Sequence, residues 1–259
     1  MRWCRHPGGG RVEALCDNAQ VAHHSDAPLA QAPTSAPPLD DAWPVIPLFN
    51  EGPVIRKVVE SVRQVFPHVV VVDDGSQDDS VQQARLAGAT VLRHPINLGQ
   101  GAALQTGFQY LLERTDARYA VTFDADGQHR VQDAAAMVQA ARSEDLGFVL
   151  GSRFLDGSTK VSLAKRAVLG AATWVSSRST GMRLTDAHNG LRVLRRDAMA
   201  RLELSQNRMA HASEIINQLA RTGLPWREHP VQIAYTDYSK AKGQSLWNSV
   251  NILVDLVFS

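Results

Sequence analysis

The chain has 259 residues, 44% of them hydrophobic, which fits one α/β domain with a substantial core. It carries 27 Lys and Arg against 26 Asp and Glu, and this net charge of +1 argues against wholesale binding to nucleic acid. Cys4 and Cys16 both lie near the N-terminus, which argues against a disulfide framework and favours a cytoplasmic setting.

The first 42 residues differ in composition from the rest of the chain. The segment "HHSDAPLAQAPTSAPPLDDA" is rich in Ala, Pro, Ser and Asp and has no sustained hydrophobic period. Such a segment cannot bury enough apolar area to offset the entropy lost on ordering. No stretch before it has the continuous apolar length of a signal peptide. We therefore expect a disordered extension over residues 1–42 and a folded domain over residues 43–245.

From Trp43 onward, short apolar runs alternate with helical patterns. The runs predict strands because they are brief and rich in β-branched or aromatic residues: "WPVIPL", "HVVVV", "ATVLR" and "YAVTF". Residues 51–66, 78–88 and 99–114 have apolar side chains at helical spacing, and another helix is expected near Val131. This alternation predicts an α/β fold with a doubly wound, mainly parallel sheet flanked by helices.

Polar segments follow the predicted strands at the points where they end: "PLFNE", "DDGS", "RHPINLGQG" and "DADGQH". The carboxyl ends of parallel strands lie at one edge of the sheet, where open α/β folds bind their ligands. A plainer interpretation of "DDGSQDD" is a turn in which Gly75 has positive φ and Asp78 caps the next helix. Both roles are compatible with a ligand site at this edge.

Five motifs, "IPLFNE", "VVVVDDGSQDDS", "NLGQGAALQTG", "DADGQH" and "GSRF", occur in an order and spacing that resembles family 2 inverting glycosyltransferases of the GT-A fold. Within this family the chain most resembles the polyprenyl-phosphate sugar transferases, such as dolichyl-phosphate mannosyltransferase. The resemblance covers roughly residues 45–245. It implies a hexosyltransferase that moves a sugar from a nucleotide-diphospho-sugar to polyprenyl phosphate at the cytoplasmic face of a membrane.

The resemblance places a divalent cation at "DADGQH". Loss of a nucleoside diphosphate requires neutralisation of the charge that grows on the leaving oxygens. Asp124, Asp126 and the side-chain carbonyl of Gln128 offer the hard oxygen ligands that Mg²⁺ or Mn²⁺ prefers. In the resembled enzymes the matching residues bind the metal. The alternative is that the two acids only form a turn or cap the helix near Val131.

The donor nucleotide is expected at the first two strand ends. By resemblance, the base and ribose pocket is lined by Pro47, Phe49 and Glu51, and the nucleoside is contacted by Asp73 and Asp74. Phe49 departs from the tyrosine usual in the family, so ring stacking is kept and a hydroxyl hydrogen bond is lost. The sequence leaves the nucleotide open among UDP, GDP and dTDP.

The glycines of "NLGQG" allow two interpretations. Gly99 and Gly101 precede a helix, so backbone N–H groups there could bind a phosphate. Related sequences often carry lysine at the position of Gln100, and the missing charge favours close packing of the loop instead.

Residues beyond "GSRF" form the expected acceptor half, in which repeated cations alternate with apolar residues before an acidic turn and a short strand. By resemblance, the acceptor phosphate is held by Arg153 together with Lys165 or Arg166, and Arg192 matches the arginine of the family's "GFR" element. The alternative for each cation is a solvated surface charge. We favour the functional role for Arg153.

A general base is needed only by some acceptors. A hydroxyl must lose a proton, whereas a polyprenyl phosphate is already an anionic nucleophile that needs only orientation. The candidates for a base are Asp186, His188 and Glu214. We assign Asp186 a site role, with ordering of its own loop as the alternative, and Glu214 is equally compatible with anchoring a helix.

Residues 246–259 predict an amphipathic helix after Lys240 and Lys242. Its apolar run is shorter than the roughly 20 residues that span a bilayer, so it either packs on the domain or lies on a membrane surface.

Three hypotheses follow. The leading one is metal-dependent hexosyl transfer to polyprenyl phosphate. The second is a soluble family 2 transferase acting on a saccharide or small-molecule hydroxyl. The third, a protein that binds nucleotide-sugar without turnover, is disfavoured by the intact Asp124, Asp126 and Gln128.

Overall fold

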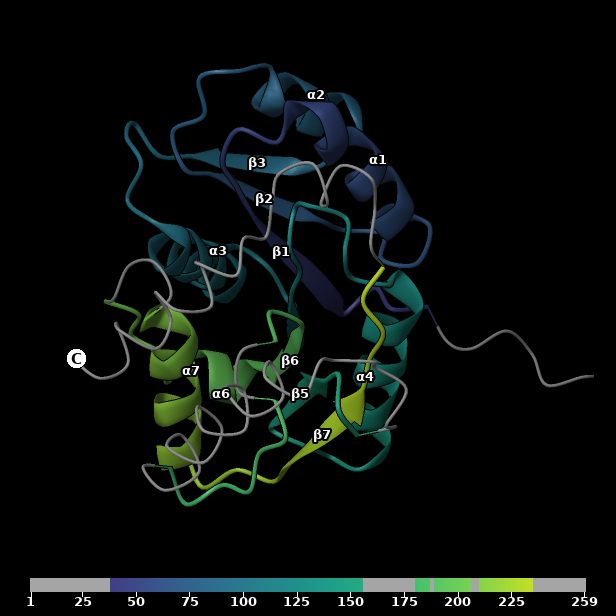
Figure 1. The fold of residues 1–259 in the computed structure, drawn as a ribbon, viewed down its shortest axis with the longest axis vertical. Coiled ribbons are helices and arrows are strands. Elements are labelled where there is room, and N and C mark those ends of the chain that lie inside the picture. The colour runs from purple at the N-terminus through teal and green to yellow at the C-terminus, as the bar shows by residue number, and fades with distance from the viewer. Residues whose placement is uncertain (1–37, 156–179, 187–188, 206–209, 235–259) are drawn as a thin grey trace, which may run out of the picture. The chain divides into compact units, whose positions relative to one another are not determined.

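The computed structural model describes residues 38–155, 180–186, 189–205 and 210–234 (Figure 1). Several predictions lie outside these residues: the part of the predicted extension over residues 1–42 that precedes residue 38, the C-terminal helix over residues 246–259, and the roles of Lys165, Arg166 and His188. They stay predictions.

The described elements alternate strands with helices, as the sequence pattern predicts (Figure 1). The strands are β1 (Ala42–Leu48), β2 (Val70–Asp73), β3 (Thr90–Arg93), β4 (Tyr119–Thr122), β5 (Phe148–Ser152), β6 (Arg192–Arg195) and β7 (Trp226–Pro230). The helices are α1 (Gly52–Arg63), α2 (Ser80–Leu86), α3 (Gln100–Arg114), α4 (Val131–Ser143), α6 (Arg196–Met199) and α7 (Ala210–Arg221). The four predicted strands and the predicted start of α4 at Val131 are confirmed.

The strands form one mixed sheet in the order β3-β2-β1-β4-β6-β5-β7. Strands β3, β2, β1 and β4 are parallel to one another, and β5 is parallel to β7. Strand β6 is antiparallel to both β4 and β5. The α/β fold with a mainly parallel sheet is therefore confirmed. Because β4 and β5 run in the same direction, their carboxyl ends and the start of β6 share one edge.

Side chains of alternate strand residues enter two separate cores, as the two-residue period of a strand requires. On β2, Val71 packs in one core and Val70 and Val72 pack in the other. Helices α1, α2 and α4 cover the first face, and α3, α6 and α7 cover the second. A sheet covered on both faces explains the continuous apolar runs of β2 and β4, all of whose residues are buried.

No helix among the described residues has the length and apolar character needed to cross a membrane.

Candidate active site

The loop after β1 is tied to the loop after β2 by backbone-to-side-chain hydrogen bonds. The Asn50 N–H donates to Ser76 Oγ at 2.9 Å, and the Glu51 N–H donates to Ser80 Oγ at 2.8 Å. Asn50 has a positive φ of 53°. These bonds bring the two strand ends together, as expected for parallel neighbours that build one site.

The turn interpretation of "DDGSQDD" is confirmed. Gly75 has a φ of 82°. Asp78 Oδ1 accepts the N–H of Ser80, the first residue of α2, at 3.0 Å, and its Oδ2 accepts the N–H of Gly52, the first residue of α1, at 3.1 Å. Partial burial would raise the pKa of Asp78, but these hydrogen bonds outweigh it and lower the pKa. One carboxylate thus holds the N-termini of two helices.

Asp73 and Asp74 are both buried and bonded within the protein. Asp73 Oδ1 accepts the Ser76 N–H at 3.1 Å, and Oδ2 accepts Arg93 Nε–H at 3.2 Å. Asp73 is fully buried and Asp74 is 3% exposed. The structure therefore gives both carboxylates a role in holding loops, and their contact with a nucleoside stays a prediction.

Asp74 holds the loop that contains "NLGQG". Its Oδ1 accepts the Leu98 N–H at 2.8 Å and lies 2.8 Å from His94 Nδ1, while Oδ2 accepts the Gly99 N–H at 2.7 Å. Both N–H groups come just before α3, so an internal carboxylate, rather than a phosphate, accepts the N–H of Gly99. The close-packing interpretation of this loop agrees with the structure.

Of the residues predicted to line the base and ribose pocket, Pro47 is the second-last residue of β1, and Phe49 and Glu51 follow its carboxyl end. Phe49 is 45% exposed, and Pro47 and Glu51 are half-buried. An exposed ring at a strand end can stack on a planar base. The exposure of Phe49 is compatible with stacking, and the contact of these residues with a nucleotide stays a prediction.

Asp124 follows β4 and is held on both oxygens. Its Oδ2 lies 2.8 Å from His129 Nε2, and its Oδ1 accepts the Gln100 side-chain amide at 3.3 Å. Burial would raise the pKa of Asp124, but the charge and hydrogen bond of His129, with smaller effects of Arg192 and His211, lower it. Asp124 is therefore an ionised carboxylate in a fixed orientation.

Gly190 makes this placement of Asp124 possible. A Cβ atom built at position 190 would lie 2.5 Å from Asp124 Oδ2. The hydroxyl of Thr122, on β4, donates to the Gly190 carbonyl oxygen, and the Arg192 N–H donates to the same hydroxyl at 3.0 Å. These hydrogen bonds hold the start of β6 against β4. At Gly190 only a hydrogen atom, and no side chain, faces the Asp124 carboxylate.

Asp126 is a carboxylate whose ionisation the protein disfavours. Burial and the neighbouring charge of Asp124 raise its pKa, although its Oδ1 accepts the Gln128 N–H at 2.9 Å. Gly127 between them has a φ of 74°, so these residues do form a turn. They do not cap α4, which begins at Val131 without a side-chain cap. Two neighbouring carboxylates under mutual repulsion fit a cation that would relieve it.

The predicted third ligand, Gln128, is half-buried, and its backbone carbonyl accepts the Ala234 N–H at 2.9 Å. Among the described residues, no three His, Cys, Asp or Glu side chains are grouped to hold a metal. A metal here would rely on the two aspartates and Gln128, together with oxygens of substrate or water.

His129 is a site residue that the sequence argument missed. It is 8% exposed, and its ring lies edge-on to Phe123 with 5.5 Å between centroids. Its Nδ1 atom is buried without a hydrogen-bond partner among the described residues. Its position directly after Gln128 in "DADGQH" was the available signal.

Arg153 and Asp186, both predicted site residues, form a two-pronged ion pair after β5. Arg153 Nε–H and Nη2–H donate to Asp186 Oδ2 and Oδ1 at 2.6 and 2.8 Å, and the Arg153 backbone N–H donates to Oδ2 at 3.1 Å. The Asp186 side chain is 1% exposed and that of Arg153 is 26% exposed. Asp186 therefore fixes the plane of the Arg153 guanidinium. This agrees with the interpretation of Asp186 as a residue that orders the structure around it.

Glu228 of β7 holds the loop that carries Asp186, and the sequence argument missed it. Its Oε1 accepts the N–H groups of Thr185 and Asp186 at 2.8 and 3.1 Å, and its Oε2 accepts the Thr185 hydroxyl at 2.9 Å. Nothing in "WREHP" itself marks this glutamate, because its partners are more than 40 residues away.

Arg192, the first residue of β6, is 2% exposed. Burial lowers its pKa to about 10, against the opposing effects of Asp124 and Asp186. Its Nη2 has no hydrogen-bond partner among the described residues. This buried cation thus lies within electrostatic reach of Asp124 and Asp186, and its contact with an acceptor phosphate stays a prediction.

Glu214 of α7 anchors a neighbouring loop. Its Oε1 accepts the Ser205 N–H at 3.1 Å and the Ser205 hydroxyl at 2.8 Å. This matches the anchoring interpretation of Glu214.

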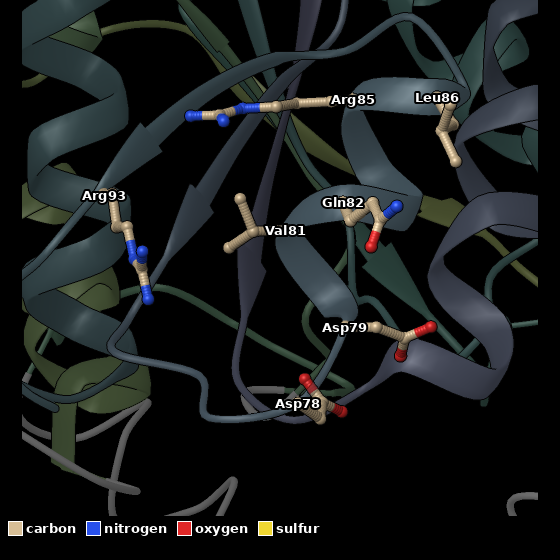
Figure 2. Close-up of a pocket in the computed structure, with 7 residues that line it drawn as sticks. All are labelled: Asp78, Asp79, Val81, Gln82, Arg85, Leu86 and Arg93. Carbon is tan, nitrogen blue, oxygen red and sulfur yellow. The ribbon is translucent and has the colours of Figure 1, made fainter.

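A surface cavity of about 430 Å³ lies elsewhere, beside α2 and the end of β3 (Figure 2). It is lined by Asp78, Asp79, Val81, Gln82, Arg85, Leu86 and Arg93. None of the predicted site residues lines it. We place the site by its chemistry, at the carboxyl edge of the sheet, because the carboxylates and Arg153 are gathered there.

Comparisons with known proteins identify the family of the chain. The family model described as Glycosyl transferase family 2 matches residues 45–202. A UDP-N-acetylglucosamine–dolichyl-phosphate N-acetylglucosaminyltransferase of Methanococcus voltae is 27% identical over 235 residues, 82% of this chain and 93% of that protein. A polyprenol monophosphomannose synthase of Mycolicibacterium smegmatis is 30% identical over 185 residues, 67% of this chain and 68% of that protein.

A solved structure shares the fold. Glucosyl-3-phosphoglycerate synthase from Mycobacterium tuberculosis, in complex with Mn²⁺, UDP and phosphoglyceric acid, matches with a TM-score of 0.61 at 17% identity. The match covers 83% of this chain and 77% of that one. This likeness and the sheet order show the GT-A fold, and the family model shows that the chain is a glycosyltransferase. The chain belongs to glycosyl transferase family 2, and the predicted resemblance to its polyprenyl-phosphate sugar transferases is confirmed.

Proposed function

We propose that this enzyme transfers a hexose from a nucleotide-diphospho-sugar to polyprenyl phosphate, with inversion at the anomeric carbon and with a divalent cation. The observation that carries the proposal is that two carboxylates and a guanidinium, groups of opposite charge, lie at the same edge of the sheet. Asp124 and Asp126 follow β4, and the oriented guanidinium of Arg153 follows β5. Carboxylates suit a metal-bound diphosphate, and a guanidinium suits a second phosphate.

On the donor side, a bound Mg²⁺ or Mn²⁺ would neutralise charge on the departing diphosphate. Asp124, Asp126 and Gln128 would hold it. His129 and Gln100 keep the Asp124 carboxylate in place, so the ligand is oriented before the substrate arrives. Phe49 would stack on the base, with Pro47, Glu51, Asp73 and Asp74 completing the nucleotide site. The UDP donor named for one relative supports UDP among the candidates.

On the acceptor side, Arg153 would grip the phosphate, with Lys165 or Arg166 and Arg192 adding positive charge. A phosphate attacks as an anion and needs no general base. The engagement of Asp186 with Arg153 fits this chemistry better than a role for Asp186 as a base. The names of the two polyprenyl relatives support the same acceptor class.

A lipid acceptor would bring the enzyme to the cytoplasmic face of a membrane. The predicted helix over residues 246–259 would then lie on the membrane surface or pack on the domain.

The testing experiment incubates the purified protein with radiolabelled UDP-, GDP- and dTDP-sugars and Mn²⁺, with and without polyprenyl phosphate in detergent. We expect one label to enter the organic phase only when the lipid phosphate is present. Transfer of label to saccharides or small alcohols, with none to the lipid, would establish the hydroxyl-acceptor hypothesis instead. Nucleotide-sugar binding without transfer to any acceptor would favour the binding-only hypothesis.

A further inference from the structure

The Glu228 carboxylate joins β7 to the loop that carries Asp186. Glu228 lies on the edge strand β7, opposite Leu150 of β5. Two backbone N–H groups and one hydroxyl of the Thr185–Asp186 loop converge on its two oxygens. Hydrogen bonds to an ionised acceptor are stronger than neutral ones, so this single side chain sets the position of the loop.

The loop in turn sets the position of Arg153. Asp186 bonds its guanidinium through two parallel N–H donors and also bonds its backbone N–H. A second link runs through hydroxyl groups, since Thr185 Oγ1 is hydrogen-bonded to Ser152 Oγ, which also accepts the Phe154 N–H at 3.2 Å. Ser152, before Arg153, is therefore bonded directly to this loop, and Phe154, after it, is linked to the loop through Ser152.

We propose that Glu228 is a positioning residue for acceptor recognition, which acts through Asp186 on the guanidinium of Arg153. The inference rests on the proposed function, in which Arg153 grips the acceptor phosphate. Two of the five guanidinium N–H groups are used by Asp186, and they fix the plane in which the guanidinium meets its ligand. A guanidinium fixed beforehand loses less conformational freedom when the phosphate binds.

The contacts of Glu228 predict different effects for two substitutions. In Glu228→Gln, the amide oxygen can still accept the N–H groups of Thr185 and Asp186, and the amide N–H can donate to the Thr185 hydroxyl. In Glu228→Ala, both backbone N–H groups lose their acceptor and the loop is released. Glu228→Gln should therefore keep the Thr185–Asp186 loop in place although it removes the charge, whereas Glu228→Ala should release the loop.

The experiment measures the KM for polyprenyl phosphate and the KM for the nucleotide-sugar in the full-length enzyme. We expect Glu228→Ala to raise the acceptor KM by about tenfold or more and to leave the donor KM within about twofold. Glu228→Gln should stay within about threefold of wild type in both constants. If Glu228 contributed to stability alone, Glu228→Ala would lower the amount of active enzyme without raising the acceptor KM relative to the donor KM.

The matched control is Asp197→Ala, which breaks another two-pronged pair of the same kind. Arg195 Nε and Nη2 donate to Asp197 Oδ1 and Oδ2, both at 2.8 Å, at the opposite edge of the sheet. We expect this variant to leave both KM values unchanged.

A second readout does not depend on catalysis. In protein labelled with ¹⁵N-arginine, the Arg153 Nε–H signal, assigned by its loss in Arg153→Lys, should be protected from exchange in wild type and Glu228→Gln. It should exchange rapidly in Glu228→Ala. Two results would overturn the inference. One is an Arg153 Nε–H signal that remains protected from exchange in a folded Glu228→Ala protein, and the other is an equal change in the acceptor KM and the donor KM. If wild type transfers nothing to polyprenyl phosphate, the proposed function fails, and the Arg153 signal alone decides whether Glu228 positions this side chain.

Discussion

Replacing Gly190 by alanine tests whether catalysis depends on the present position of the Asp124 carboxylate. A Cβ at position 190 would lie 2.5 Å from Asp124 Oδ2 and 3.0 Å from Oδ1. Ordinary contacts begin at 3.4 Å. The carboxylate must therefore retreat by about 0.9 Å, the difference between 3.4 and 2.5 Å, unless the tightly packed start of β6 moves instead.

This retreat disturbs the bonds that orient Asp124. Its Oδ2 lies 2.8 Å from His129 Nε2, so a shift of this size lengthens the bond beyond hydrogen-bond range or rotates the carboxylate. A misplacement of about 1 Å near the reacting atoms can cost roughly a hundredfold in rate. We expect Gly190→Ala to lower kcat by about a hundredfold and to raise the Mn²⁺ concentration needed for half-maximal activity.

The assay is transfer of labelled sugar as a function of Mn²⁺ concentration, with thermal unfolding measured on the same samples. Gly147→Ala is the matched control, because its Cβ would also lie 2.5 Å from another atom, Leu224 Cβ, at the other end of β5. We expect this control to lower Tm with kcat near wild type. A folded Gly190→Ala enzyme with wild-type kcat and Mn²⁺ dependence would refute the reasoning.

Three further predictions concern the carboxylates and Arg153. Asp126→Asn should reduce kcat by about two to three orders of magnitude in a folded protein, and full activity of wild type in EDTA would contradict the role given to the cation. Burial and Asp124 raise the pKa of Asp126 in the folded protein, so ionising Asp126 destabilises the metal-free protein. This cost is complete above the raised pKa, shrinks as the pH falls through it, and is gone below the ordinary pKa of an aspartate. Thermal unfolding should therefore show Asp126→Asn more stable than wild type at pH 7 without metal, with the difference shrinking toward acidic pH. Arg153→Ala should raise the acceptor KM about tenfold or more with little change in nucleotide affinity, and Arg153→Lys should rescue only in part. Loss of donor binding in Arg153→Ala would instead assign Arg153 to the diphosphate site.

The strands and helices from β1 to α4 were predictable because their local signals agree with the fold. The apolar run of β2 is fully buried, and the turn after it needs the positive φ of Gly75 that its sequence indicates. The antiparallel placement of β6 between β4 and β5 was not predictable from a repeating strand–helix pattern. That placement depends on pairing between distant segments, for which local periodicity carries no signal.

The candidate site was predictable where a motif carries its own chemistry, as at Asp124 and Asp126. The partners of the site residues were harder to predict. Arg153 and Asp186 were both expected at the site, but their direct pairing follows from two segments meeting 33 residues apart in sequence. Glu228 reaches the same loop from β7, and its importance appears only when its hydrogen bonds are traced. Long-range side-chain contacts of this kind leave no local pattern in the sequence.

The most direct test of the central claim compares polyprenyl phosphate with the corresponding polyprenol as acceptors, using the full-length enzyme, Mn²⁺ and its active nucleotide-sugar. Mass spectrometry and NMR of the lipid product should show a hexose joined through phosphate, with the anomeric configuration inverted relative to the donor, and no product from polyprenol. Transfer to polyprenol at an equal rate, or a product with retained configuration, would contradict the account.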